Sequence, residues 1–295
     1  DVAVAGLRGR GGAAYRCLAG SAPTLRHLAL AQSALATSDV EHVFQDGGMP
    51  ALELLYVPSC RRLTPSAFAA IARGAPALTN LDVSNTAFND GSLRAVAGGL
   101  PTLRALAATL CADLRDLSPL HQHAGLEWLA VGFAACRNLH AVASMPRLHT
   151  LTLTGVPPSL RDARAAATSA GGGGGEVCGL PECPGDVSAL ASCPSLTSLC
   201  MRGGVLAPTS FASWSQPDAT LRAKLRSLVV RDCAGLPSAD PLRWVGAFTR
   251  LEHLVLASNS GSPDDARVGA HGDSDAPAFT KLRARLPRLR YVEIG

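Results

Sequence analysis

The six-residue pattern Leu-x-x-Leu-x-Leu recurs along the whole sequence, and this repetition constrains the fold more than any other feature. Ten copies begin at Leu25, Leu52, Leu78, Leu103, Leu126, Leu148, Leu196, Leu225, Leu251 and Leu289. The third apolar position also accepts Val, Ala, Met or Ile, and proline often precedes the first leucine by two residues. A unit this short cannot bury its apolar face alone, so neighbouring units must stack to form a continuous core.

Each copy predicts a short strand, because its apolar residues alternate with a period of two. Helix signals follow the early strands. We predict that Thr64 caps a helix with Pro65 in its first turn, that Ser38 and Glu41 form a capping box, and that Asp90 caps a third helix. The fourth to sixth repeats show no clear helix signal.

On these residues the sequence resembles the leucine-rich-repeat family over essentially its whole length. Residues 52–64 are similar to the cysteine-containing subclass found behind F-box domains. Residues 116–120 resemble a shorter repeat type common in protozoan and bacterial proteins. The resemblance implies an α/β solenoid: a horseshoe with parallel strands on the concave face and short helices or irregular segments on the convex face.

We expect a single domain over residues 1–295, with about eleven repeats and two flexible insertions. The insertions are predicted at 157–177, which holds five consecutive glycines, and at 257–280, which is rich in Ser, Gly and Asp. Residues 1–5 predict an eleventh strand, and residues 13–19 its helix. Because both ends of the sequence fall inside a repeat, we expect the chain to be part of a longer one, with its uncapped ends covered by further protein.

Composition narrows the setting. Hydrophobic residues make up 47% and charged residues 17% of the sequence, and no apolar run is long enough to cross a bilayer, so we expect no membrane partner. The nine cysteines lack paired spacing and favour a reducing compartment. We therefore expect an intracellular protein, with the cytoplasm or the cytoskeleton and cilium favoured and the mitochondrion left open.

The strand alternation predicts which side chains point away from the core and line the concave face. As partner-binding candidates we select Tyr56, Asn80, Asp82, Trp128, Thr152, Arg202, Arg231, His253 and Tyr291. The same alternation places Ala107, Ala130 and Val255 outside. Tyr56 and Trp128 are typical interface anchors, unless Trp128 tucks under a neighbouring loop. Arg202 and Arg231 fall on adjacent strands, where they are either a clamp for a carboxylate or two solvated side chains.

No motif for catalysis, a cofactor or a metal stands out. Cys60, Cys111, Cys233 and Asn259 share one phase of the repeat, which indicates a buried turn position. A redox thiol there would need a lowered pKa. Cys178, Cys183 and Cys193 lack zinc-site spacing. His121 and His123 could bind a metal, but we interpret them as solvated loop residues. Gly9–Gly12 lacks a phosphate-loop ending.

The sequence therefore favours a non-enzymatic protein-interaction scaffold, a structural subunit of a large intracellular assembly, with protein partners on the concave face and at the ends. One alternative is a substrate-recognition subunit of a ubiquitin ligase. Another is an RNA-contacting subunit of a ribonucleoprotein. The RNA hypothesis rests on the basic C-terminal third, with Arg222, Arg226, Arg283, Arg285, Arg288 and Arg290.

Overall fold

The computed structural model describes residues 2–3, 23–45, 48–133, 139–155, 186–207, 210–234, 242–257, 282 and 284–294. The predicted helix at 13–19, the insertion at 157–177 and all but one residue of the insertion at 257–280 lie outside these ranges, as do Gly9–Gly12 and Asn259. The chain divides into two compact units, Asp1–Leu151 and Thr152–Gly295.

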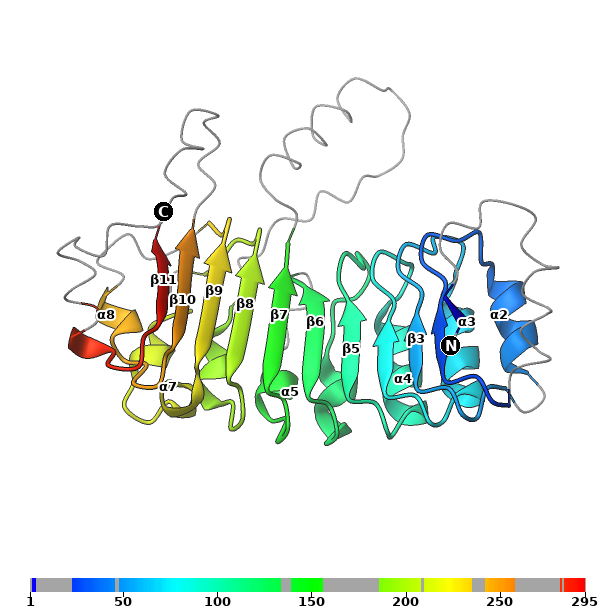
Figure 1. Cartoon of the computed structure of the whole chain (residues 1–295), viewed down its shortest axis with the longest axis horizontal. Helices are drawn as coiled ribbons and strands as arrows, with labels where there is room; N and C mark the ends of the chain where they lie inside the picture. The colour runs from blue at the N-terminus through cyan, green and yellow to red at the C-terminus, as the bar shows by residue number, and fades with distance from the viewer. Residues whose placement is uncertain are drawn as a thin grey trace, which may run out of the picture. The chain divides into compact units, whose positions relative to one another are not determined.

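The first unit repeats a strand and a returning segment. Its strands are β1 (Val2–Ala3), β2 (His27–Ala29), β3 (Leu54–Tyr56), β4 (Asn80–Asp82), β5 (Ala105–Ala108) and β6 (Trp128–Gly132). Its helices are α2 (Thr37–Phe44), α3 (Pro65–Gly74), α4 (Asp90–Gly99), the 3-10 turn η1 (Ser118–Gln122) and α5 (His140–Ala143). The strands lie side by side in sequence order, with the helices behind them (Figure 1). Strand β7 (Thr150–Thr154) contains the division between the units.

The second unit has the same organisation with shorter helices. Its strands are β8 (Ser198–Arg202), β9 (Ser227–Arg231), β10 (His253–Ala257) and β11 (Tyr291–Ile294). Its helical segments are η3 (Ser188–Ser192), η4 (Ser213–Ser215), α7 (Thr220–Lys224) and α8 (Leu242–Val245). All four strands are parallel and ordered as in the sequence.

The leucine pattern sets the register of the strands. Leu28, Leu55, Leu81, Leu106 and Leu129 are direct partners across neighbouring strands, and each is at most 2% exposed. Because side chains alternate along a strand, these leucines form one column facing the helices, and the residues between them face away. Burial of such columns is the main favourable contribution to folding.

A tight turn follows the strand in most described repeats. The residue seven positions after the first leucine has a positive φ at Gln32, Ser59, Asn85, Leu110 and Asp232, between 51° and 61°. At Gln32, Ser59, Asn85 and Asp232 its backbone N–H donates to the next repeat, as from Ser59 to the Ser84 carbonyl at 2.8 Å. The turn therefore links neighbouring repeats in addition to reversing the chain.

The cysteine that follows this turn is buried. The thiol of Cys60 donates to the Leu30 carbonyl at 3.0 Å, and that of Cys111 to the Val83 carbonyl at 3.4 Å. Burial raises the pKa of Cys111, and it raises the pKa of Cys233 to about 11. These shifts are opposite to what a redox thiol would need, so the structural interpretation of this position holds.

Two of the predicted helix caps are wrong. In α2, Ser38 and Glu41 form no capping box. The helix already begins at Thr37, and the Ala36 N–H donates to the Asp39 carboxylate at 3.0 Å. In α4 the cap is Asn89, whose side chain accepts from the Ser92 N–H at 2.9 Å. Several polar residues lie near each helix start, and only the one with extended backbone immediately before the helix can cap it.

The residues expected to cap have other roles. Asp90 accepts from the backbone N–H groups of Arg115 and Asp116, at 2.7 and 2.9 Å, and so links two repeats. Thr64 does precede α3 and Pro65 is its first residue, but the Thr64 side chain makes no helix-capping bond. Its hydroxyl shares a hydrogen bond with the Thr37 hydroxyl at 2.9 Å.

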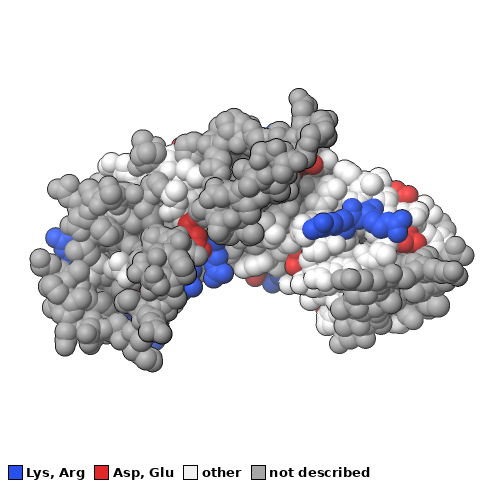
Figure 2. Space-filling model, turned by 90° about the horizontal axis from the view of Figure 1, so that it is seen from above, with Lys and Arg blue, Asp and Glu red and all other residues white. Residues whose placement is uncertain are grey.

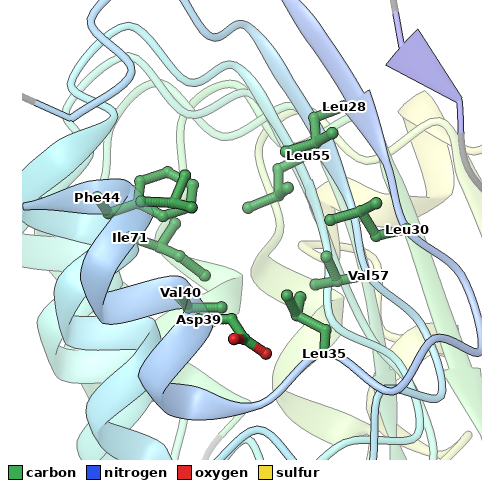
Figure 3. Close-up of a pocket in the computed structure, with 10 residues that line it drawn as sticks. Leu28, Leu30, Leu35, Asp39, Val40, Phe44, Leu55, Val57 and Ile71 are labelled. Atoms are coloured by element: carbon green, nitrogen blue, oxygen red, sulfur yellow. The ribbon is translucent and has the colours of Figure 1, made fainter. Parts of the chain in front are cut away.

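The returning segments shorten after the third helix. The fourth repeat has the 3-10 turn η1, and the fifth has the four-residue helix α5. The sequence shows no clear helix signal in these repeats, so the short helix α5 is a departure from that expectation, whereas the 3-10 turn η1 agrees with it. A small apolar pocket lies between the strands and helices of the early repeats, where Leu28 and Leu55 face Phe44 and Ile71 (Figure 3). It has room for about one water molecule and is a packing gap.

Candidate interaction surface

The strand face that points away from the helices is called here the open strand face. In the first unit it consists of the outward residues of β2 to β6: His27, Ala29, Leu54, Tyr56, Asn80, Asp82, Ala105, Ala107, Trp128 and Ala130. Tyr56 is 41% exposed and Trp128 is 36% exposed, so Trp128 is not fully tucked under a loop. Ala107 and Ala130 were expected outside, but they are 7% and 3% exposed.

Two polar residues stand between the aromatic residues. Asp82 is paired in register with Tyr56 on one side and Ala107 on the other. One of its oxygens, Oδ1, accepts from the Ser84 N–H at 2.8 Å, which fixes the carboxylate. Asn80 is exposed, and its oxygen accepts from the Thr79 hydroxyl at 2.8 Å. Both side chains are thus held by neighbours close to them in the chain.

Charged residues at the entry to the strands pair with one another between repeats. Arg26 pairs with Glu53, and Arg104 with Glu127, each at 3.2 Å. Such exposed pairs add little stability, in general between zero and about 1 kcal/mol. Their effect is on the surface potential, because each pair cancels its own charge. Figure 2 looks down on the opposite end of the strands, where basic side chains form a strip on the right of the view with acidic side chains beside it.

In the second unit the open face is crossed by an ion pair. Arg231 on β9 donates to Glu293 on β11 at 2.7 Å, and the Tyr291 hydroxyl donates to the same carboxylate oxygen at 3.1 Å. The pair spans β10, where Val255 lies in register between Val229 and Glu293. Val255 was expected outside and is 1% exposed, because this pair and its neighbours cover it.

The pair changes the interpretation of the predicted arginine clamp. Arg202 and Arg231 are partners in register, as expected, but Arg231 is half-buried and engaged with Glu293, whereas Arg202 is exposed. His253 is half-buried and stacks flat on Tyr291, with ring centres 4.6 Å apart. Thr152, also a candidate, is half-buried on β7. The signal that could have indicated Glu293 is its opposite charge, on an outward position two strands from Arg231.

The histidine interpretation needs one correction. His121 is exposed and shares a hydrogen bond with the Ser144 hydroxyl at 3.1 Å. His123 is 5% exposed, and its Nε2 donates to the Leu100 carbonyl at 2.9 Å. This bond satisfies the carbonyl of Leu100 at the C-terminal end of α4, so His123 is not a solvated loop residue. Within the described ranges, no group of three or more His, Cys, Asp or Glu side chains is arranged to hold a metal ion.

Part of the basic C-terminal third is used internally. Arg222 donates to the carbonyls of Ala247 and Gln216, at 3.2 and 3.0 Å, and Arg226 pairs with Glu252 at 3.5 Å. Arg285, Arg288 and Arg290 are exposed, and Arg283 lies outside the described residues. None of the described helices has the length and apolarity to cross a membrane.

Comparison with solved structures bears on the fold. The chain is similar to an internalin, InlF, from Listeria monocytogenes, with a TM-score of 0.55 and 16% identity over 96% of this chain and 74% of that one. It is also similar to the leucine-rich-repeat domain of the type III effector XopL (TM-score 0.43, 18% identity, covering 92% and 68%). A third similar structure is internalin C2 of Listeria monocytogenes (0.37, 16%, covering 88% and 92%).

The chain has the leucine-rich-repeat fold. The parallel strands in repeat order and the likeness to InlF support this conclusion together. No model of a known protein family matches the sequence, and no curated protein is similar to it in sequence. The subclass of its repeats therefore stays a prediction. In a leucine-rich-repeat fold the strand residues that face the helices form the hydrophobic core. The side chains on the open strand face can differ from repeat to repeat.

Proposed function

We propose that this chain is a non-enzymatic protein-interaction scaffold that binds its partner on the open strand face. The observation that carries the proposal is the exposure of Tyr56 and Trp128, at 41% and 36%, on strands whose inward residues are fully buried. Exposed Tyr and Trp combine a large apolar area with a polar group, and they dominate the binding energy of many interfaces. Solvent exposure of two such rings serves no packing purpose.

The remaining candidates lie on the open strand face of one unit or the other. In the first unit Asn80 and Asp82 lie between the aromatic residues and supply hydrogen-bonding groups. In the second unit the proposed contacts are Thr152, Arg202, Arg231, His253 and Tyr291. Arg231 contributes mainly as a fixed part of the surface, since it is paired with Glu293, whereas Arg202 supplies an exposed charge.

The scaffold works inside the cell as a structural subunit of a large assembly. Five described cysteines are free: Cys60, Cys111, Cys193, Cys200 and Cys233. Free thiols are typical of reducing compartments. No specific contact favours the ubiquitin-ligase alternative, and the RNA alternative is weakened by the internal use of Arg222 and Arg226.

A photocrosslinking experiment tests the surface. A benzophenone side chain is placed at position 56 or 128 of the full chain, and a third variant carries it at Arg94, which is exposed on α4. After irradiation in cells that express the chain naturally, captured proteins are identified by mass spectrometry. We expect the same protein from positions 56 and 128 and its absence from position 94. Equal capture from all three positions, or capture only from position 94, would contradict the proposal.

The Tyr56→Ala/Trp128→Ala double variant tests whether the two aromatic rings are needed to bind the captured protein. Because both rings are partly exposed, we expect an unchanged circular dichroism spectrum and at least about tenfold weaker binding of the captured protein. Loss of the folded spectrum would show that the two rings belong to the core and would refute their assignment to an interface.

A further inference from the structure

We infer that the open strand face of the first unit recognises a lysine or arginine side chain in an extended segment of the partner protein, held between the Tyr56 ring and the Asp82 carboxylate. This inference rests on the proposed function, because it names the chemistry of the partner at the same surface. Tyr56 and Asp82 are opposite each other on adjacent parallel strands. Adjacent strands are about 4.8 Å apart, so both groups can contact one bound cation.

Charge selects the sign of the ligand. Among the described outward residues of β2 to β6, Asp82 carries the only formal charge at neutral pH. The strand-entry arginines Arg26 and Arg104 pair with Glu53 and Glu127, and the exposed Arg61 and Arg62 lie in the turn after β3 and not on the strand face. Since a phosphate or carboxylate would meet a carboxylate without a compensating cation, a nucleic acid or an acidic segment is disfavoured at this position.

The carboxylate is oriented for an incoming donor. Its Oδ1 is engaged by the Ser84 N–H at 2.8 Å, which leaves Oδ2 to accept from a ligand. The face of the exposed Tyr56 ring attracts a cation, and an arginine or lysine can use the ring and the carboxylate together. A carboxylate held in this way has less rotational freedom to lose on binding than a free surface aspartate.

The neighbouring side chains fit the rest of an extended segment. The Asn80 oxygen is occupied by the Thr79 hydroxyl, so its amide N–H groups can donate to a peptide carbonyl. Beyond it, β5 forms a low strip, in which Ala105 is half-buried and Ala107 is buried. Trp128 is in register with Ala105 and bounds this low strip on its far side. An apolar ligand side chain can therefore lie over Ala105 and against the Trp128 ring, next to the cation position.

Selection from a displayed library of extended nine-residue peptides tests the inference on the full chain. We expect enriched peptides to carry a lysine or arginine, and Asp82→Asn to weaken their binding by roughly 10- to 100-fold. The asparagine keeps an oxygen for the Ser84 N–H, so the fold is preserved. Asp113→Asn removes the same charge from an exposed turn and should leave binding unchanged. Tyr56→Phe should retain binding, and Tyr56→Leu should weaken it by roughly two- to fivefold.

The outcomes separate the two proposals. Peptides that require Tyr56 and Trp128 but contain no basic residue, or are insensitive to Asp82→Asn, overturn this inference and leave the proposed function standing. Peptides insensitive to the Tyr56→Ala/Trp128→Ala variant, or no enriched peptides, overturn both. Single-stranded RNA that binds through the two aromatic residues, and more tightly after Asp82→Asn, would identify a different class of partner and refute the inference.

Discussion

Two buried tryptophans in the second unit permit a test in which one substitution is made at two matched sites. Trp214 is 0% exposed, and its indole N–H donates to the Val187 carbonyl at 3.0 Å. Trp244 is 5% exposed, and its indole nitrogen is buried with no partner among the described residues. Both contact the Phe211 ring, with ring centres 4.9 and 4.4 Å away. They share an environment and differ in the satisfaction of one polar group.

Replacing either tryptophan by phenylalanine removes the same atoms. The loss of packing costs about 1–2 kcal/mol at each site, by scaling from larger truncations. Trp214→Phe also loses a hydrogen bond, which adds about 1 kcal/mol. Trp244→Phe instead removes an unsatisfied buried donor, whose presence costs about 1–3 kcal/mol. We therefore expect Trp214→Phe to lower the free energy of unfolding by about 2–3 kcal/mol and Trp244→Phe to change it little.

Urea unfolding followed by far-ultraviolet circular dichroism measures both values without relying on tryptophan fluorescence. The predicted difference of at least about 2 kcal/mol is well above the usual extrapolation error for variants with the same slope. Equal losses at the two sites, or the larger loss in Trp244→Phe, would refute the reasoning. Such a result would mean that the hydrogen bond to the Val187 carbonyl contributes nothing or that the Trp244 N–H has a partner.

Two further predictions concern a turn and an ionisable group. Leu110 has a φ of 56° and is 55% exposed, and asparagine tolerates this left-handed backbone better than leucine does. Leu110→Asn should therefore raise the free energy of unfolding by about 0.5–1 kcal/mol, whereas Asn85→Leu at the equivalent turn should lower it. Thermal denaturation measures both changes, and changes of the opposite sign would contradict this argument. The hydrogen bond to Glu293 and the charge of that carboxylate raise the pKa of Tyr291. The folded chain therefore retains this proton longer than the unfolded chain, so stability from this group is present below pH of about 10 and is lost as the pH rises further. Ultraviolet absorbance titration measures tyrosine ionisation, and subtracting the curve of Tyr291→Phe isolates the signal of Tyr291. The titration midpoint of Tyr291 should be lower in Glu293→Gln than in the unchanged chain. An unchanged midpoint would contradict the contact between the two side chains.

The sequence was sufficient to predict the strands and their register. Both follow from a short-range pattern: when alternate strand residues must be buried, only one orientation of the strand places the leucines in the core. The spacing of the repeats alone aligns Leu28, Leu55 and Leu81, and these residues are direct partners in the sheet. The turn cysteines were predictable for the same reason, since Cys60 and Cys111 hold one phase of the repeat.

Features that depend on contacts between repeats were harder to predict. Val255 is outward by alternation but buried, since Arg231 and Glu293 meet across its strand. His123 has the sequence context of a loop residue, yet it donates to the Leu100 carbonyl in the preceding repeat. In both cases the decisive contact joins two different repeats, and the periodicity of a single repeat does not indicate which residues of another repeat it will contact. The candidate residues of the interaction surface could be named, but the ion pair that engages Arg231 could not.

The repeats themselves provide an internal comparison for the interaction surface. The residue four positions after the first leucine is Tyr in the second repeat, and its equivalents are Ala29, Asp82, Ala107, Ala130, Thr152, Cys200, Val229, Val255 and Glu293. Small, branched and charged side chains all occupy this one structural position, so stacking of the repeats does not require an aromatic residue there. A large exposed ring also adds a liability for nonspecific association. Because neither local packing nor solubility accounts for Tyr56 beside Asp82, this pair supports the proposal that a partner binds here.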